Sequence, residues 1–460
     1  MINQDFSING LNLRQSPFTH GDLLRAVNVN TDYIGAKTKR SGYGTYLNSL
    51  GTRINTLFNW SLGNGTQFWN YAYAGGTLHY STQGTGAWTV CGNGTFTGGS
   101  FIGHAVLNDT LILGDGVNAT RHTTDGTSFT NTTLAPISEQ FEEYQGRIWA
   151  IGTASYAFYS TTGTATDWAT DSTSILIPSE GKNKYVYKVS DRLYFGKTSG
   201  LSYRWDGYSL VDLSTNLAYT SPASIAEVEG YKIGINRLGF YGNGGGNLEA
   251  LSNPILRQIY NTSDTGIIGT SFDQAPATVY NYDYLCAVGT ISDDLTNGTV
   301  VDAVLKYNIQ LNEWLNWQFA DYPTAMMNYK DTSGSQQLIW GDATGQCYQY
   351  AGTAQSDNGK PIVSEMMGFI HGGNFEIKEW HSLKGLFSPG SGVKIQYCIT
   401  NTFRKEGFVW EDAGQPIDGV FNLNLSGKRG QFLFWRIYES SRFSRYSFYG
   451  WQCEFDIVKH

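Results

Sequence analysis

The sequence predicts an all-β fold: a six- or seven-bladed β-propeller, preceded by an extended N-terminal arm and followed by a C-terminal β-sandwich. Three observations lead to this prediction. First, the 460 residues include 55 glycines, 30 tyrosines and 13 tryptophans, and only 15% are charged, a composition typical of strands and tight turns. Second, a short apolar pattern that ends in glycine recurs along the chain. Third, the sequence lacks long runs rich in Ala, Leu, Glu and Lys, which would favour helices.

The N-terminal arm, residues 1–52, contains one short helical candidate. The stretch "LLRAVNV" follows Asp22, which is a suitable N-cap residue. The remainder of the arm has the pattern of extended chain. It either lies over the propeller as an ordered arm or supplies the strand that closes the ring.

The propeller prediction covers residues 53–355 and depends on a repeat. Alternating apolar residues end at a first glycine in five clear copies and two weaker ones: Gly75, Gly114, Gly152, Gly196 and Gly341, with Gly234 and Gly289 as the weaker members. Successive first glycines are separated by 39, 38, 44, 38, 55 and 52 residues. A period of about 40 residues is the length of a four-stranded antiparallel unit, and radial stacking covers the apolar faces of such units. We expect the first glycine to supply the unusual backbone angles of a tight turn.

A second glycine follows the first after eleven or twelve residues in the clear copies: Gly86, Gly126, Gly163, Gly207 and Gly352. The segments "YSTQGTGAW", "HTTDGTSF", "YSTTGTATDW" and "YRWDGYSL" surround four of these positions. They resemble degenerate Asp-box turns, which join the outer strands of many propeller blades. A β-sandwich or a solenoid built from similar hairpins is the alternative architecture.

The C-terminal β-sandwich is predicted for residues 364–460, after a polar linker at 354–363 in which Pro361 should interrupt strand pairing. Beyond the linker the pattern becomes plain alternation, which places one face of each strand on a core. The inward positions are Val393, Ile395, Tyr397 and Ile399; Phe421, Leu423 and Leu425; and Trp451, Cys453, Phe455 and Ile457. Two further strands are expected in "EWHSLKGLFS" and "QFLFWRIYES".

Charge is distributed unevenly along the chain. Residues 53–360 carry 15 basic and 26 acidic side chains, a net charge of −11, whereas both flanks are slightly positive. An acidic body does not suit a protein that must neutralise phosphates to bind nucleic acid. Five arginines of the predicted sandwich, Arg404, Arg429, Arg436, Arg442 and Arg445, are either solvated strand positions or contacts with a neighbouring subunit.

The most glycine-rich stretch is "GFYGNGGGNLEAL", residues 239–251. Its central residues are Gly242, Asn243, Gly244, Gly245, Gly246 and Asn247. They form either a mobile gate of a channel or an ordinary connection within a blade.

Catalytic, metal and cofactor sites are not predicted. The seven histidines are scattered, and the five cysteines lie far apart without CxxC spacing, as expected of buried, reduced thiols. Glu142 and Glu143 are adjacent, which predicts solvated turn residues rather than an acid pair. The sequence also lacks an export signal and any run near the roughly 18 apolar residues of a membrane span.

The N-terminal arm carries a phrase that runs from "GLNLRQSP" through "N-V" to a G-x-x-x-x-R-x-G motif made by Gly35, Arg40 and Gly42. This wording resembles the opening of virion structural proteins of tailed phages. The blade-and-sandwich layout is similar to the tail nozzle, or tail hub, proteins of short-tailed phages. The extra domains of larger nozzles are not expected in a chain of this length.

The resemblance implies a structural role in the virion tail after synthesis in the host cytoplasm. Subunits of this family form a ring, typically of six, below the portal and adaptor, where tail fibres can attach and DNA leaves without sequence-specific binding. An acidic, stiff propeller suits such a passage because it would not retain a polyanion. The alternative is a glycan-binding propeller, a lectin or a phage receptor-binding protein, in which aromatic residues stack on sugars.

Overall fold

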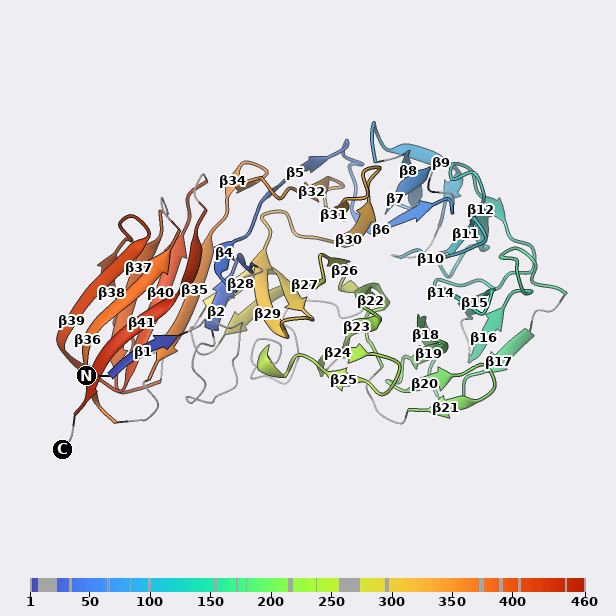
Figure 1. Cartoon of the computed structure of the whole chain (residues 1–460). Helices are drawn as coiled ribbons and strands as arrows, with labels where there is room; N and C mark the ends of the chain where they lie inside the picture. The colour runs from blue at the N-terminus through green and yellow to red at the C-terminus, as the bar shows by residue number, and fades with distance from the viewer. Residues whose placement is uncertain are drawn as a thin grey trace.

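A computed structural model gives the structure of the chain (Figure 1). It describes all residues except 1, 7–22, 33–34, 64, 66, 83, 98–100, 153–154, 171–172, 179, 214–217, 237, 256–273, 294–297, 372–375, 389–391, 404–406, 443–444 and 459–460. The described chain is built of β-strands and two short 3-10 helices, so the predicted all-β class is confirmed.

Five four-stranded antiparallel sheets follow one another in the described part of the chain. Sheet 1 consists of β6 (Ile54–Ser61), β7 (Phe68–Ala74), β8 (Thr77–Thr82) and β9 (Thr89–Thr95). Sheet 2 consists of β10 (Gly103–Leu107), β11 (Thr110–Gly114), β12 (Arg121–Thr123) and β13 (Thr130–Asn131). Sheet 3 consists of β14 (Phe141–Tyr144), β15 (Arg147–Ile151), β16 (Tyr156–Tyr159) and β17 (Thr173–Leu176). Sheet 4 consists of β18 (Asn183–Val189), β19 (Arg192–Lys197), β20 (Ser202–Trp205) and β21 (Leu210–Asp212). Sheet 5 consists of β22 (Ala226–Val228), β23 (Tyr231–Asn236), β24 (Gly239–Asn243) and β25 (Glu249–Ala250), flanked by η1 (Pro222–Ser224) and η2 (Asn253–Ile255).

Two further sheets combine strands from distant parts of the sequence. Sheet 6 consists of β26 (Ala277–Tyr280), β27 (Asp283–Asp293), β28 (Gly298–Asn308) and β29 (Glu313–Gln318). Sheet 7 consists of β30 (Ala325–Lys330), β31 (Gln336–Gly341), β32 (Cys347–Tyr350) and β5 (Tyr43–Tyr46), extended by the small hairpin of β33 (Ser356–Asp357) and β34 (Lys360–Pro361). Sheets 1 to 7 surround a common centre with their first strands innermost, and β30 packs against β6 (Figure 1). We call this propeller-like arrangement the ring.

The C-terminal sheets face each other beside the ring (Figure 1). One continues from sheet 6 through β2 (Leu23–Val27), β35 (Ser364–Ile370), β40 (Phe432–Glu439), β37 (Lys394–Thr400) and β38 (Glu411–Gly414). The other contains β3 (Val29–Thr31), β4 (Lys37–Lys39), β41 (Ser447–Ile457), β36 (Lys378–Phe387) and β39 (Val420–Gly430), and β1 (Ile2–Phe6) pairs with β41. Their inner faces share one apolar core that includes Trp380, Trp435 and Trp451.

The ring sheets meet through aromatic and aliphatic side chains. Trp60, Trp69 and Tyr71 of sheet 1 pack in one cluster with Leu111 and Leu113 of sheet 2. Of the thirteen tryptophans, eleven are buried and the other two are half-buried. The aromatic content of the sequence therefore serves mainly as packing material between and within sheets.

The first glycine of the repeat has a different role from the one that the sequence predicts. Among the clear copies only Gly75 has a positive φ, of +57°. The other four have no room for a side chain: a Cβ on Gly196 would lie 2.0 Å from the Tyr185 ring, and one on Gly341 would lie 2.6 Å from Ile54. The first glycine thus permits close packing. The second glycine adopts left-handed turn angles in four of the five clear copies, for example +78° at Gly126 and +100° at Gly207, and Gly352 is the exception.

The N-terminal arm also differs from the prediction. Leu23–Val27 is the strand β2 and not a helix, because it pairs with β35 and its residues Leu23 and Ala26 are fully buried; this tertiary pairing outweighs a weak helical propensity. The segment from β2 to β5 contributes strands to three sheets, and β5 is the outer strand of sheet 7. Pro361 does not end pairing either, because it lies in the edge strand β34 opposite Ser356.

Candidate functional site

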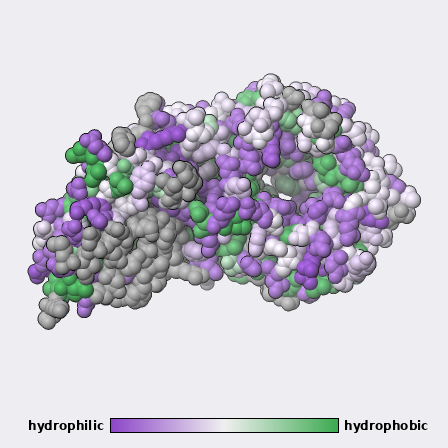
Figure 2. All heavy atoms as spheres, viewed as in Figure 1, coloured by the Kyte–Doolittle hydropathy of each residue, from purple (hydrophilic) through white to green (hydrophobic). Residues whose placement is uncertain are grey.

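The centre of the ring is the first candidate site. Figure 2 shows an opening there, bordered on this face by mostly hydrophilic residues. Glu142 and Glu143 lie on the innermost strand β14 and not in a turn as predicted, because β14 continues through both residues to Tyr144. The Lys188 side chain on β18 donates to Glu143 at 2.7 Å, and the Lys188 backbone N–H donates to Glu142 at 3.2 Å.

Burial and charge affect these two carboxyl groups differently. Burial raises the pKa of Glu142 above its ordinary value, although Lys232 and Lys188 act in the opposite direction. Burial is the largest influence on Glu143 and acts to raise its pKa. The hydrogen bonds from Lys188 and from the Gly146 N–H, together with the charge of Lys188, outweigh burial, so that the pKa lies below the usual value. The innermost strands therefore carry at least one carboxylate that stays ionised at neutral pH.

The proposed gate residues, 242–247, lie where the two outer strands of sheet 5 are connected. Gly242 and Asn243 end β24, and residues 244–247 begin the connection to β25, so the segment joins the third and fourth strands of sheet 5. It is held against sheet 4, where Arg192 donates to the carbonyl oxygen of Gly245 at 2.8 Å and Asn243 donates to the Tyr187 hydroxyl at 2.9 Å. The structure thus places these residues in a hairpin of the outer strands of sheet 5 that is anchored on sheet 4, and their role as a gate stays a prediction.

The G-x-x-x-x-R-x-G motif lies where the ring meets the C-terminal sheets. Gly35 has a φ of +87° in the turn between β3 and β4. Arg40 is 1% exposed, forms a two-pronged ion pair with Asp357, and donates to the Asn28 side chain at 2.7 Å. Gly42 has no room for a side chain, because a Cβ there would lie 1.9 Å from the Ser356 carbonyl oxygen.

The motif is part of a buried basic segment, Lys37–Arg40. Lys37 is paired with Glu313 of β29, and Lys39 with Glu439 of β40. Burial lowers the pKa of Lys37, although the charge of Glu313 partly offsets this effect. Three charges within four residues therefore reach a ring strand, a C-terminal strand and the β33 hairpin, which fixes the joint between the two parts of the molecule.

The five arginines predicted at subunit contacts occupy different surroundings. Arg404 lies outside the described residues. Arg429 pairs with Glu379 at 2.7 Å, Arg436 pairs with Glu365 at 2.7 Å, and Arg445 donates to the carbonyl oxygens of Gly352 and Ala354. Arg442 is exposed. Three of them thus have partners within the chain, and their role between subunits stays a prediction.

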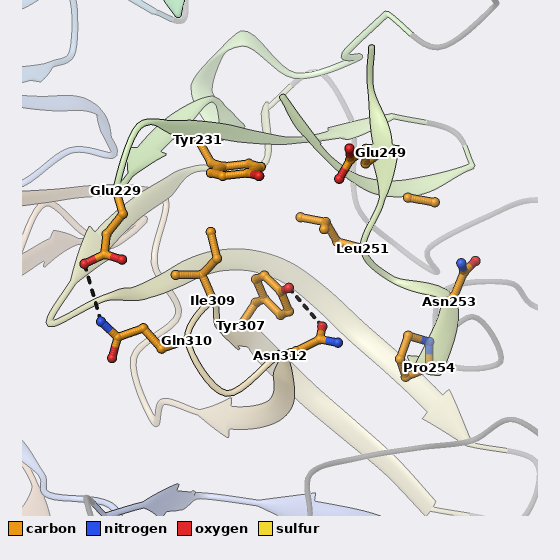
Figure 3. A pocket seen from close by; sticks show the side chains of 11 residues that line it. Glu229, Tyr231, Glu249, Leu251, Asn253, Pro254, Tyr307, Ile309, Gln310 and Asn312 are labelled. Atoms are coloured by element: carbon orange, nitrogen blue, oxygen red, sulfur yellow. Dashed lines mark hydrogen bonds between the residues drawn. The ribbon is translucent and has the colours of Figure 1, made fainter. Parts of the chain in front are cut away.

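Sequence reasoning missed a cleft of about 620 Å³ between sheets 5 and 6 (Figure 3). Its walls come from the β22–β23 turn, from β25 and the segment after it, and from the end of β28 and the turn that follows. The lining residues are Glu229, Tyr231, Glu249, Ala250, Leu251, Asn253, Pro254, Tyr307, Ile309, Gln310 and Asn312. The sequence does contain a signal at this sheet: no second glycine follows Gly289 after eleven or twelve residues, as one does in the clear copies of the repeat.

Two observations concern metal-ligand and thiol chemistry in the described part of the chain. Among the described residues, no group of three or more His, Cys, Asp or Glu side chains is placed to hold a metal ion. All five cysteines are buried, and burial raises the pKa of Cys286 and Cys453 to about 12, so these thiols are protonated at neutral pH. No helix in the described part of the chain is long and apolar enough to cross a membrane.

Comparisons with known proteins leave the family open. No family model matches the sequence, and no curated protein matches it. Similar solved structures include the computationally designed Ika8 protein (TM-score 0.38, 10% identity, 68% of this chain and 100% of that one). They also include BBS1N in its complex with ARL6DN (0.44, 9%, 68% and 97%) and a chain of the Mitotic Checkpoint Complex (0.42, 9%, 68% and 93%).

Proposed function

We propose that this protein is a structural subunit of a phage tail nozzle, or tail hub, and that it assembles into a ring around the path of the viral DNA. In this proposal sheets 1 to 7 are the seven blades of a closed propeller, β5 completes the last blade, and the C-terminal sheets form a β-sandwich. The packing of β30 against β6 and the pairing of β5 with β32 support the closed form. The common core of the two C-terminal sheets supports the sandwich.

The observation that carries the proposal is the buried N-terminal motif. The first part of the wording that resembles tailed-phage virion proteins, GLNLRQSP, lies outside the described residues. Its later part, with Gly35, Arg40 and Gly42, lies at the joint between the two parts of the chain, and each of these three residues has a steric or electrostatic reason to be there. A rigid joint between a stiff ring and a flat pair of sheets suits a particle component that must keep its shape under load.

The acidic charge of the body supports a passage that does not retain DNA. Residues 53–360 have a net charge of −11, and Glu142 and Glu143 lie on an innermost strand. A polyanion gains little from such a surface, because binding to DNA depends on neutralising its phosphates. In this proposal the virion tail is the location, and the neighbours are copies of the chain, a portal or adaptor ring, and tail fibres.

Mass photometry at micromolar concentration tests the proposal, alone and with a portal–adaptor complex present. We expect a closed oligomer of about six subunits, with a mass about six times that of the 50.9-kDa chain, in one or both conditions. If the arginines of the C-terminal sheets contact a neighbouring subunit, Arg442→Glu should weaken the oligomer. Glu180→Gln, a change at an exposed residue of sheets 1 to 7, should not. A chain that stays monomeric in both conditions contradicts the proposal.

The glycan-binding alternative is separated by a glycan array. A lectin needs exposed aromatic platforms. Every tryptophan is buried or half-buried, whereas Tyr156, Tyr208 and Tyr282 of the ring are exposed, so the array has to decide. Specific binding of glycans by a monomer would favour this alternative over the nozzle.

A further inference from the structure

The junction between sheets 5 and 6 departs from the neighbouring junctions of the ring. Between sheets 3 and 4, the β20–β21 hairpin with Gly207 lies against Gln145 of the β14–β15 turn. Between sheets 4 and 5, Gly245 of the β24–β25 hairpin accepts a hydrogen bond from Arg192. In sheet 6 the corresponding connection, residues 309–312, has no glycine, and the cleft of about 620 Å³ opens at this place. This volume lies within the range of small-molecule sites.

The charge of the cleft selects against anions. Two carboxylates, Glu229 and Glu249, belong to its lining, and no lysine or arginine does. From the described residues, Glu229 accepts one long hydrogen bond of 3.4 Å, from Gln310. For Glu249, neither a hydrogen bond nor an ion pair is found among the described residues, and its side chain is exposed. A cation in the cleft would therefore meet negative charge that other side chains have not neutralised.

The shape of the cleft separates its two charges. Figure 3 shows Glu229 and Glu249 on opposite sides of the Tyr231 ring. Between them the walls are largely apolar, with the ring of Tyr231 on one side and Ile309 and Leu251 facing it (Figure 3). Tyr231 is 38% exposed, so its ring is available to a ligand.

The Glu229 carboxylate is placed at the cleft by a tight hairpin turn between β22 and β23. The φ of Glu229 is +48°, and Gly230 follows with +81°. The first hairpin turns of sheets 3, 4 and 6 have similar left-handed angles at Gln145, Ser190 and Asn281, so this is the regular turn of the repeat. The turn fixes the position of the carboxylate at the edge of the cleft.

We propose that this cleft binds an aliphatic diamine or polyamine. One ammonium group pairs with Glu229 and the other with Glu249, while the methylene chain lies along Tyr231, Ile309 and Leu251. The face of Tyr231 adds a cation–π attraction for an ammonium group that passes over it. This binding proposal is independent of the proposed place of the chain in a virion.

Isothermal titration calorimetry of the full chain tests the proposal with putrescine and spermidine as probes. We expect saturable binding that weakens as sodium chloride is raised, because ionic strength screens partly exposed charges. 1,4-Butanediol, which has the length of putrescine without its charge, should give no binding. The double variant Glu229→Gln/Glu249→Gln should bind putrescine about tenfold more weakly or not at all.

Matched controls keep the result interpretable. Glu180→Gln makes the same chemical change at an exposed residue outside the cleft and should bind as the unmodified chain does. Far-ultraviolet circular dichroism and the thermal midpoint of each variant should be unchanged. The proposal is overturned by an absence of binding of both amines, by equal binding of butanediol, or by unchanged affinity in the double glutamate variant. Competition by a neutral monosaccharide would identify the cleft as a sugar site instead and would equally overturn it.

Discussion

The sheets of the ring meet one another through apolar side chains and closely packed glycines, whereas the joint between the ring and the C-terminal sheets adds buried ion pairs to a shared apolar core. Gly341 of sheet 7 packed against Ile54 of sheet 1 is an example of the contact between ring sheets, and Gly196 against Tyr185 shows the same close packing within sheet 4. At the joint to the C-terminal sheets, Lys37, Lys39 and Arg40 pair with three acidic residues from three different elements. The two kinds of contact differ in what they specify: apolar packing is proportional to area and tolerant of direction, whereas a buried ion pair is stable only in one geometry.

The two kinds of contact therefore serve different ends: apolar packing stabilises the ring, and the ion pairs fix the orientation of the ring relative to the C-terminal sheets. The ring can gain its cohesion from many similar apolar contacts, and the loss of one reduces the total by a limited amount. The joint depends on a few charges whose partners become unpaired and buried when one is removed. We therefore expect the largest effects of single substitutions at the joint, and the three predictions below test that order.

The largest effect is expected for Arg40→Met. It leaves Asp357 buried without its partner and removes the donors to Asn28 and to the carbonyl oxygen of Gln318, so the free energy of unfolding should fall by about 3–5 kcal/mol in urea titrations. Arg40→Lys should not restore it, because a lysine cannot reproduce the planar set of donors.

The control for this prediction is the double variant Arg40→Met/Asp357→Leu. It removes the unpaired carboxylate together with the arginine, and we expect it to recover part of the loss. If the single variant is as stable as the unmodified chain, the joint does not depend on this ion pair. Substitutions at the joint would then not be more damaging than substitutions in the ring.

An intermediate effect is expected for Gly196→Ala in the ring. The added methyl group would lie 2.0 Å from the Tyr185 ring, which must shift together with its neighbours, so the free energy of unfolding should fall by about 1–3 kcal/mol. Gly352→Ala is the matched control: no atom lies within 4 Å of the position that its methyl group would take, and its effect should stay within about 0.5 kcal/mol. Equal effects of the two changes would mean that close packing at the first glycine is not important.

The smallest effect concerns the pH dependence of the ring. Burial lowers the pKa of His104 to about 4, and its ring stacks on Phe58 at 4.2 Å. Because the unfolded state then binds the proton more readily than the folded state, protonation of His104 lowers the free energy of unfolding. The stabilising contribution of neutral His104 is complete above a pH of about 6.5 and is lost as the pH falls toward 4. Since the His104 residue is half-buried, we expect the free energy of unfolding to fall by about 1–2 kcal/mol rather than by the full equivalent of the pKa shift.

Urea titrations at several pH values measure this effect against His104→Phe, which keeps an aromatic ring and removes the titrating group. The variant should lose less stability than the unmodified chain between pH 7 and 4. Parallel pH profiles of the two proteins would show that His104 does not contribute.

The repeat made the ring predictable and left the joint unpredictable. Alternation followed by glycine every 40 residues or so is a local pattern, and it located the strands of sheets 1 to 5 and of sheet 7. The role of Gly196 was misjudged because a sequence does not distinguish a glycine required by its φ from one required by the ring of Tyr185. Leu23–Val27 was misassigned because its partner, β35, lies more than 300 residues away. The cleft was missed because the absence of a glycine at residues 309–312 becomes a signal only once the hairpin contacts at the two preceding junctions are known.

The pairing of β5 with β32 has a consequence for synthesis of the protein. Tyr46 must wait for Cys347 to leave the ribosome before its strand has a partner, a delay of about 15–60 s at typical translation rates. Until then six neighbouring sheets can form in order, while β5 of the seventh sheet has no β32 to pair with. Premature termination before Cys347 would leave that early strand exposed and ready to pair with other chains, so quality control of this protein is decided late in its production.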